Sequence, residues 1–299
     1  MDLIKNISII FISIFLESLP FLFLGSLISA IIETFISNDT IAKIIPKNKV
    51  IGSIVGVFLG FFLPACDCAV IPVSKRLLKK NVPINVAISF MLASPIINPV
   101  VLLSTYNAFY KTNPEIFWYR LIFGIVIALI IGIIMGIIFN KKEVITNRLI
   151  DDCDEECHKC HHEHHKNKFI SICHHTSTDL FEVLKYLIIG ALIASLIQVL
   201  IPRNILTTFN NNQILSILVL MLFAYLISLC STSDSFVGKS LLTIFNKNSI
   251  IAYLLLGPMI DIKNTIVLLG NYKKKFVYTL ILLIFIIIFI FSVLVVNIL

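Results

Sequence analysis

LPACDC, at residues 63–68, interrupts a stretch of sequence that is otherwise apolar enough to cross a membrane. Two thiols and a carboxylate are costly in hydrocarbon unless they face the protein interior or a water-filled path. A related interruption, CSTSDS at residues 230–235, places Cys230 164 residues after Cys66. This arrangement predicts a membrane transporter built from two related halves, with a polar pathway that carries thiols.

The composition is that of a polytopic membrane protein. Of the 299 residues, 58% are hydrophobic and 14% are charged, whereas soluble domains are about 45–50% apolar and about 25% charged. Residues 1–36 are too long and too apolar for a cleaved signal peptide, and we expect them to form the first span. The net charge of +7 is modest, and short loops carry it, which favours a lipid bilayer over nucleic acid as the partner.

A spanning helix needs about 20 apolar residues. On this basis we predict an all-α polytopic membrane protein of about eight transmembrane helices, at residues 7–36, 50–78, 83–109, 117–139, 180–201, 213–245, 249–270 and 276–298. Proline or polar residues interrupt four of these spans, at residues 63–68, 94–99, 230–235 and 257–261. Proline removes a backbone donor and clashes with the preceding turn. Broken helices survive at membrane depth only where protein or a cavity covers the freed backbone.

The two halves of the chain align almost without gaps. Positions match at offsets of 165, 164 and 163, and several of them are polar, glycine or proline: Glu17, Gly25 and Glu33 with Glu182, Gly190 and Gln198; Cys66, Lys75 and Leu77 with Cys230, Lys239 and Leu241; Pro95 and Asn98 with Pro258 and Asp261. Repeats with interrupted helices at corresponding positions point to a transporter's binding site. We therefore predict two tandem repeats, a first transmembrane repeat at 1–139 and a second at 178–299, joined by a cytoplasmic Cys/His-rich linker at 140–177.

The distribution of positive charge predicts the orientation. With eight spans, fourteen Lys and Arg residues lie on the side of both termini and nine on the other side. Cytoplasmic loops carry the excess of positive charge. Both termini and the linker are therefore expected in the cytoplasm.

The cysteines at the interruptions form the first candidate site. Thiolates are soft ligands that suit Cu(I) or Zn, and a trivalent arsenical is thiophilic by the same reasoning. Cys66 and Cys68 lie two residues apart, so both can reach one ion, and Cys230 can supply a third sulfur at the interface between the repeats. The alternative is that these cysteines are only small buried hydrophobic residues.

Carboxylates and other polar residues extend this candidate site. Buried carboxylates bind cations or carry protons in coupled transporters; the alternative is a paired structural charge, such as Asp261 with Lys263. Glu17 and Glu182 are further carboxylates inside predicted spans. Hydroxyl groups near the interruptions either bind substrate or satisfy loose backbone groups. The predicted substrate-binding residues are Cys66, Cys68, Cys230, Asp67, Asn98, Asp234, Asp261, Ser94, Ser231 and Ser233.

The linker is the second candidate site, because it contains every histidine of the chain. Its possible ligands are Cys153, Cys157, His158, Cys160, His161, His162, His164, His165, Cys173, His174 and His175. Short Cys/His-rich tracts suit Zn or Cu, and in a helix Cys153, Cys157 and Cys160 would share one face. The alternative is a solvated low-complexity linker. No cofactor is required elsewhere, and metal bound here would sense or buffer rather than be transported.

Four motifs resemble those of a known family, the predicted permeases that include bacterial arsenical permeases. They are C-x-C-x-x-x-P at 66–72, S-P-x-x-N-P at 94–99, C-S-T-S-D at 230–234 and G-P-M-x-D-x-K-N at 257–264. The resemblance covers nearly the whole chain except the linker. It implies a bacterial inner-membrane permease; certain members export trivalent organoarsenicals, and a related branch is linked to copper and zinc efflux. The residues carried over are Cys66, Cys68, Pro72, Ser94, Pro95, Asn98, Pro99, Cys230, Ser231, Thr232, Ser233, Asp234, Gly257, Pro258, Asp261, Lys263 and Asn264.

Together these features predict a permease rather than an enzyme. It would export a trivalent organoarsenical or a soft metal ion through the thiol site. The chain lacks the G-x-x-x-x-G-K-[ST] motif that binds nucleotide phosphates, so we expect coupling to protons through a carboxylate, or through a partner. The alternatives are a Cu/Zn efflux permease and, in another class, a membrane thiol-redox protein that cycles Cys66 and Cys68. The sequence leaves open whether the chain forms a homo-oligomer.

Overall fold

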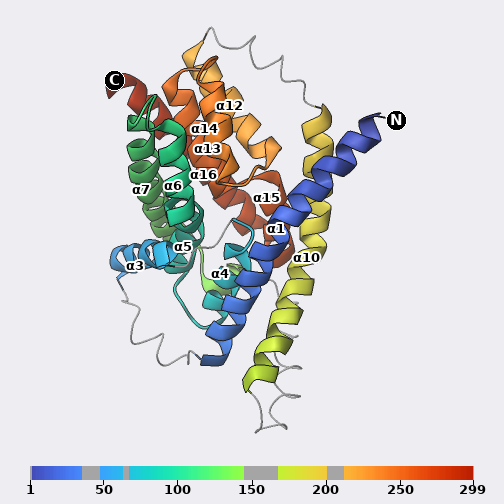
Figure 1. Cartoon of the computed structure of the whole chain (residues 1–299). Helices are drawn as coiled ribbons and strands as arrows, with labels where there is room; N and C mark the ends of the chain where they lie inside the picture. The colour runs from blue at the N-terminus through green and yellow to red at the C-terminus, as the bar shows by residue number, and fades with distance from the viewer. Residues whose placement is uncertain (1, 36–47, 63–66, 145–167, 201–211, 299) are drawn as a thin grey trace.

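The structure is a computed structural model that describes residues 2–35, 48–62, 67–144, 168–200 and 212–298 (Figure 1). Every element assigned in this part of the chain is a helix. The all-α prediction is therefore confirmed for the described residues.

Helices of similar length follow one another in the same order in both halves. The N-terminal half contains α1 (Asp2–Phe35), α3 (Lys49–Phe62), α4 (Val70–Lys79), α5 (Ile84–Ile97), α6 (Pro99–Phe109), α7 (Glu115–Ile138) and the short α8 (Lys141–Val144). The C-terminal half contains α10 (Lys168–Leu200), α12 (Gln213–Ile227), α13 (Ser233–Leu241), α14 (Lys247–Met259), α15 (Ile262–Asn271) and α16 (Lys274–Ile298). The division into two repeats stays a prediction.

Several helices are long and apolar enough to span a membrane. Within the described residues there are five, Ile4–Ile31, Glu115–Ile138, Thr176–Leu200, Lys247–Asn271 and Lys274–Leu294, or six if α5 and α6, which are bent by 40°, form one span. α3 and α12 are shorter apolar helices. The chain is thus a multi-pass membrane protein, while the count of eight spans stays a prediction.

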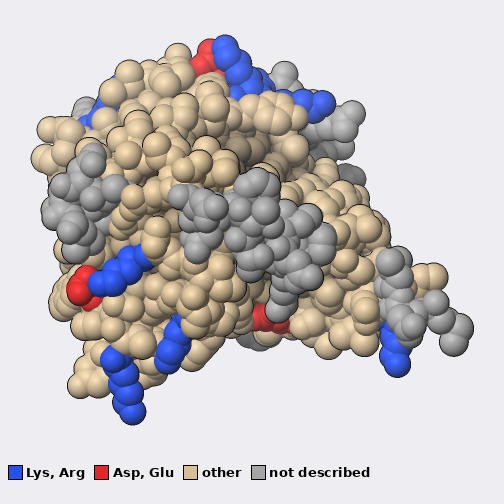
Figure 2. Space-filling model, turned by 90° about the horizontal axis from the view of Figure 1, so that it is seen from above, with Lys and Arg blue, Asp and Glu red and all other residues tan. Residues whose placement is uncertain are grey.

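The surface fits a lipid environment. Large apolar side chains are exposed on the outer helices, among them Phe58 of α3, Trp118 of α7 and Leu222 of α12. Figure 2 shows a face on which uncharged surface dominates and charged side chains stand in a few small groups. An apolar exterior of this kind is stable when acyl chains, rather than water, cover it.

The centre of the molecule is built from α5 and α14. All residues of α5 are buried, and so are almost all of α14. α3 and α7 pack on α5, and α12 and α16 pack on α14. α1 and α10 lie side by side along one flank (Figure 1). The two central helices lead directly into breaks, so the core holds those breaks in place.

All four predicted interruptions are confirmed as helix breaks. α3 ends at Phe62 and α4 begins at Val70, and the other breaks separate α5 from α6, α12 from α13 and α14 from α15. Asn98 caps α6 by accepting a hydrogen bond from the backbone N of Val100 at 3.0 Å. At the corresponding place Asp261 caps α15 and accepts from the Asn264 backbone N at 2.6 Å. Both side chains therefore satisfy backbone donors that the breaks release.

The helix that carries the fifth span begins before the span itself. α10 begins at Lys168, while its candidate span begins at Thr176, close to residue 180, where the span was expected to begin. The last part of the Cys/His-rich segment, with Cys173, His174 and His175, is therefore helical and continuous with the span. The polar residues of this segment concealed the start of the helix, because the prediction relied on apolar length alone.

Candidate functional site

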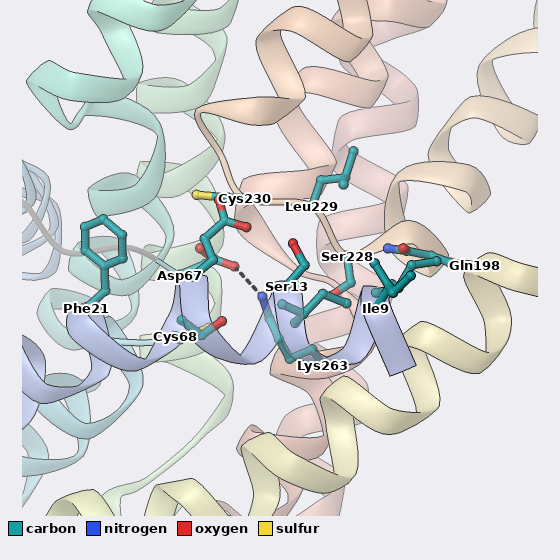
Figure 3. Close-up of a pocket in the computed structure, with 14 residues that line it drawn as sticks. Ile9, Ser13, Phe21, Asp67, Cys68, Gln198, Ser228, Leu229, Cys230 and Lys263 are labelled. Carbon is teal, nitrogen blue, oxygen red and sulfur yellow. Dashed lines mark hydrogen bonds and ion pairs between the residues drawn. The ribbon is translucent and has the colours of Figure 1, made fainter. Parts of the chain in front are cut away.

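A cavity of about 220 Å³ lies where the first thiol break meets α1, α10, α15 and the break between α12 and α13 (Figure 3). One face of α1 contributes much of its wall, since residues one helical turn apart share a face. The polar and sulfur-bearing side chains around it are Ser13, Glu17, Ser18, Asp67, Cys68, Gln198, Ser228, Cys230 and Lys263. Apolar residues of α1 complete the wall. Residues from both halves of the chain therefore meet in one cavity.

Two of the three predicted thiols line this cavity. Cys68 comes from the first break and is buried, and Cys230 comes from the second and is half-buried; neither forms a disulfide. The Cys68 Sγ lies 4.0 Å from the Ser18 Oγ, and the Cys230 Sγ lies 3.4 Å from the Thr232 Oγ1. The third predicted thiol, Cys66, lies outside the described residues.

Lys263 stands between two carboxylates. Its Nζ lies 3.6 Å from Asp67 Oδ2 and 3.6 Å from Asp261 Oδ2, and all three side chains are buried. In Figure 3 the Lys263 ammonium points at Asp67 beside the two thiols. Buried charges persist only when they are paired. Because Asp67 belongs to the first break and Lys263 to α15, this Asp67–Lys263–Asp261 cluster also joins the two halves.

Hydrogen bonds hold both carboxylates of this cluster. The Ser228 Oγ donates to Asp261 Oδ2 at 2.6 Å, and the Asn264 Nδ2 donates to Asp67 Oδ2 at 3.1 Å. Asp67 lines the cavity, whereas Asp261 lies behind Lys263 and does not. The cavity thus offers thiols, the carboxylates of Glu17 and Asp67 and one ammonium to a ligand, with the Asp261 carboxylate within reach of the ammonium.

A glycine in each long helix brings the wall residues close. A Cβ added at Gly25 of α1 would lie 2.6 Å from the Cβ of Ala69, next to Cys68. A Cβ at Gly190 of α10 would lie 3.1 Å from the Cα of Lys263. These two glycines match each other in the sequence alignment of the halves. Small residues at such places let helices approach closely in membranes.

Asp234 does not belong to the cavity. Tyr253 donates from its hydroxyl to Asp234 Oδ1 at 3.1 Å, deep in the core. Nearby, the fully buried Arg120 donates from Nη1 to Thr105 Oγ1 at 2.7 Å and to Ser235 Oγ at 2.8 Å. This polar cluster ties α6, α7, α13 and α14 together. The sequence prediction missed Arg120, although an arginine at the start of an apolar span was a usable signal.

The remaining predicted substrate residues also lie away from the cavity. Asn98 caps α6, and Ser94 is buried in α5. Ser231 accepts a hydrogen bond from Arg120 Nη2 at its carbonyl oxygen, at 3.3 Å. Ser233 begins α13. The structure brings together Asp67, Cys68 and Cys230, with Asp261 one contact behind them, and separates the other described members of the predicted set.

Conversely, the cavity includes polar residues that were not predicted as substrate-binding. Ser18, Gln198, Ser228 and Lys263 line it. Gln198 donates from Nε2 to the carbonyl of Ile227, next to the second break. Gln198 matches Glu33 in the alignment of the two halves, and this match was the sequence signal that could have identified it.

Two ion pairs fasten α4 to α10. Lys75 lies 2.7 Å from Glu182 and also donates to Asn271 at 3.1 Å. Arg76 bonds Asp179 through Nε at 3.0 Å and Nη2 at 2.6 Å. Glu182, one of the predicted intramembrane carboxylates, therefore has a structural partner. These pairs fix the helix that follows Cys68.

All but one of the predicted metal ligands of the linker have side chains outside the described residues. Cys173 is exposed on α10, and the side chains of His174 and His175 in the same helix lie outside the described residues, as do Cys153, Cys157, His158, Cys160, His161, His162, His164 and His165. Within the described part of the chain, no three His, Cys, Asp or Glu side chains are arranged to hold one ion. Metal binding by the linker stays a prediction.

Two bacterial proteins are similar to this chain over most of its length. It is 37% identical over 270 residues to a Streptococcus mutans protein named "Putative two-component membrane permease complex subunit", covering 90% of this chain and 87% of that protein. It is 40% identical over 273 residues to the Bacillus subtilis protein named "UPF0718 protein YcgR", covering 91% and 90%. No solved structure matches. Because residues 3–297 match the family ArsP_1, described as "Predicted permease", the chain belongs to that family of membrane permeases.

Proposed function

We propose that this permease exports a thiophilic substrate, either a trivalent organoarsenical or a soft metal ion, through the cavity between its two halves. One observation supports the proposal most: Cys68 and Cys230, which lie 162 residues apart in the chain, line the same cavity with Asp67. Thiolates bind soft centres, and a neighbouring carboxylate adds favourable charge for a cation. Cys66, two residues before Cys68, is proposed to supply the third sulfur.

The size and polarity of the cavity fit a small substrate. Its volume of about 220 Å³ exceeds more than tenfold the roughly 10–15 Å³ that a cavity needs in order to hold one water molecule. Ser18, Ser228 and Gln198 supply polar groups that can replace water around a ligand. A methylated arsenical or a partly hydrated metal ion can therefore enter without displacement of core side chains.

Proton coupling is the proposed source of energy. Asp261 shares Lys263 with Asp67, so a cationic substrate that binds Asp67 competes with Lys263 and alters the surroundings of Asp261. Intramembrane carboxylates that change partner in this way are typical proton carriers. Asp234 is a second candidate carrier.

We further propose that the protein lies in a bacterial plasma membrane with both termini in the cytoplasm.

A second membrane protein is a proposed partner. The Streptococcus mutans relative carries the name of a two-component permease complex subunit. If this chain also works in such a complex, the partner should co-purify with it from its own host in mild detergent.

The Cys/His-rich linker is proposed to bind Zn or Cu as a sensor rather than as cargo.

The central experiment is a substrate panel. Cells that express the chain and cells with an empty vector are challenged in parallel with methylarsenite, arsenite, Cu, Zn and Cd, and retained substrate is measured. We expect lower retention of at least one thiophilic substrate. Inverted vesicles then accumulate this substrate, and a protonophore abolishes the accumulation. Equal retention of every substrate in the two strains would refute thiophilic export.

A further inference from the structure

A second, smaller cavity adjoins the first at Asp67. Its volume is about 10 Å³, and Asp67, Met91, Pro258, Met259, Ile260 and Asn264 are among the residues around it. A space of this size holds about one water molecule or one bare ion. Of the charged side chains in the described residues, only Asp67 lines both cavities.

Asp67 divides the two cavities through contacts on both sides. Lys263 lines the first cavity but not the second, and its Nζ lies 3.6 Å from Asp67 Oδ2. Asn264 lines the second cavity but not the first, and its Nδ2 donates to the same oxygen at 3.1 Å. Two neighbouring residues of α15, each lining a different cavity, therefore contact the same carboxylate oxygen. A ligand that passes from one cavity to the other has to replace these contacts.

Two methionines from different halves line the second cavity, and the Sδ of one of them, Met91, lies 3.7 Å from the Ser74 Oγ. Met91 belongs to α5, and Met259 is the last residue of α14. Both side chains are almost fully buried. Methionine alone is a common filler of irregular gaps in protein cores, so the pair of thioethers requires an independent observation before it indicates a ligand.

Asn264 supplies that observation. Its side chain is 3% exposed, and its Oδ1 has no hydrogen-bond partner among the described residues. The opposite end of the amide donates to Asp67, which fixes its orientation. A buried acceptor without a partner costs free energy. A cation in the adjoining cavity would remove this cost.

We propose that the second cavity is a binding station for a bare, soft, monovalent cation of the Cu(I) or Ag(I) class. The thioethers of Met91 and Met259, the Oδ1 of Asn264 and the carboxylate of Asp67 would hold it. Thioether sulfur selects Cu(I) and its relatives over hard cations, and the small volume excludes a carbon-bearing arsenical. The station deepens the proposed function by placing soft-cation cargo on a path from the thiols past Asp67.

The test removes the methionine sulfur atoms and keeps the side-chain volume nearly constant. Met91→Leu and Met259→Leu are made singly and together, because Leu and Met exchange with little effect on packing. Met221→Leu is the matched control, since Met221 is buried in α12 and lines neither cavity. Each full-length protein is purified in detergent, its accessible thiols are alkylated with N-ethylmaleimide, and Ag(I) binding is measured by equilibrium dialysis. In parallel, inverted vesicles are assayed for uptake of Ag(I) and of methylarsenite.

We expect the double Met91/Met259 variant to bind Ag(I) at least about tenfold more weakly, as for other losses around metal sites. Ag(I) uptake should fall, while methylarsenite uptake should match that of the parent. Unchanged Ag(I) binding in the double variant, or an equal loss in Met221→Leu, would overturn the station. If the parent transports nothing in the panel but only the double variant loses Ag(I), the station stands and the proposed export function fails.

Discussion

The two thiol breaks occupy corresponding places in the halves but use their carboxylates differently. At the first break Asp67 faces the cavity beside Cys68 and pairs with Lys263. At the second break Cys230 faces the same cavity, whereas Asp234 lies in the core against Tyr253. The thiol is thus retained on both sides of the cavity, and only one half provides a carboxylate there.

Spacing along the chain explains the difference. Asp67 lies next to the cysteines in the turn before α4, where its side chain reaches the cavity. Asp234 lies four residues after Cys230, already in the first turn of α13, and therefore points into the helix bundle. The halves align without a gap here, at an offset of 164, so Asp234 corresponds to Val70 at the start of α4 rather than to Asp67. The comparison predicts a graded series of effects.

Loss of a thiol should have the largest effect. Cys66→Ser, Cys68→Ser and Cys230→Ser should each reduce export to the level of the empty vector, because serine oxygen is a poor ligand for soft centres. Substrate retention and resistance are measured at equal protein level. Cys173→Ser is the control, since Cys173 is exposed on α10 and lines no described cavity. Parental export in all three variants would show that the thiols are not the binding site.

Asp261→Asn should come next and block net efflux while binding to the thiols persists. The amide Oδ1 can still accept from the Asn264 backbone N, and its Nδ2 can donate to the Ser228 Oγ in place of the present bond, so the break keeps its shape, but the side chain cannot carry a proton. Uptake into inverted vesicles under an imposed pH gradient measures the effect, and direct binding to purified protein provides the comparison.

The corresponding residue of the first half is the control for that variant. Asn98→Ala should cost about 1 kcal/mol of stability through loss of the α6 cap and leave the response to pH intact. Normal transport by Asp261→Asn, or a parent that ignores the pH gradient, would make the aspartate a structural residue.

Asp234→Asn should show a smaller transport defect together with a loss of stability. Its carboxylate accepts from Tyr253 near the buried Arg120, and hydrogen bonds to charged groups contribute about 1.5–3 kcal/mol. Thermal unfolding in detergent and vesicle uptake are compared with those of Ser233→Ala at the adjacent position. A transport defect larger than that of Asp261→Asn, at unchanged stability, would reverse the assigned roles of the two breaks.

Removal of residues 153–165 should have the smallest effect on transport. This segment precedes α10, so its deletion leaves the described helices whole. Organoarsenical or soft-metal uptake should continue, while the response of transport to added Zn or Cu weakens. Vesicle uptake with and without added Zn measures both transport and its response to metal. Complete loss of transport in a stably expressed deletion would place the linker in the pathway.

The helix breaks could be predicted from the sequence because their causes are local. Pro95 and Pro258 stand inside otherwise apolar spans, and polar residues follow them. The same local logic gave Cys68 and Cys230 as cavity residues. It located the apolar span of α10 but not the polar first turns of that helix, which begins at Lys168.

The ion cluster could not be predicted in the same way, because it depends on tertiary packing. Asp67 and Lys263 are 196 residues apart, and their contact requires α15 to lie against the first break. The sequence indicated Lys263 as a local partner of Asp261 and as part of the G-P-M-x-D-x-K-N motif, and not as a partner of Asp67. The burial of Arg120 likewise depends on Thr105 and Ser235, which come from two other helices. The separation of two residues in the sequence does not indicate whether they form such a tertiary contact.

The paired salt bridges between α4 and α10 have a mechanical consequence. Lys75 and Arg76 are adjacent on α4, while Glu182 and Asp179 lie one turn apart on α10. Two such anchors fix both the sliding and the rotation of one helix on the other, and their limited contact with solvent leaves them little screened by salt. α10 has 33 residues and is therefore a rod of about 50 Å. Any tilt of this rod carries the Cys68 end of α4 with it, so a small angular change at one end of the molecule becomes a displacement of the thiol.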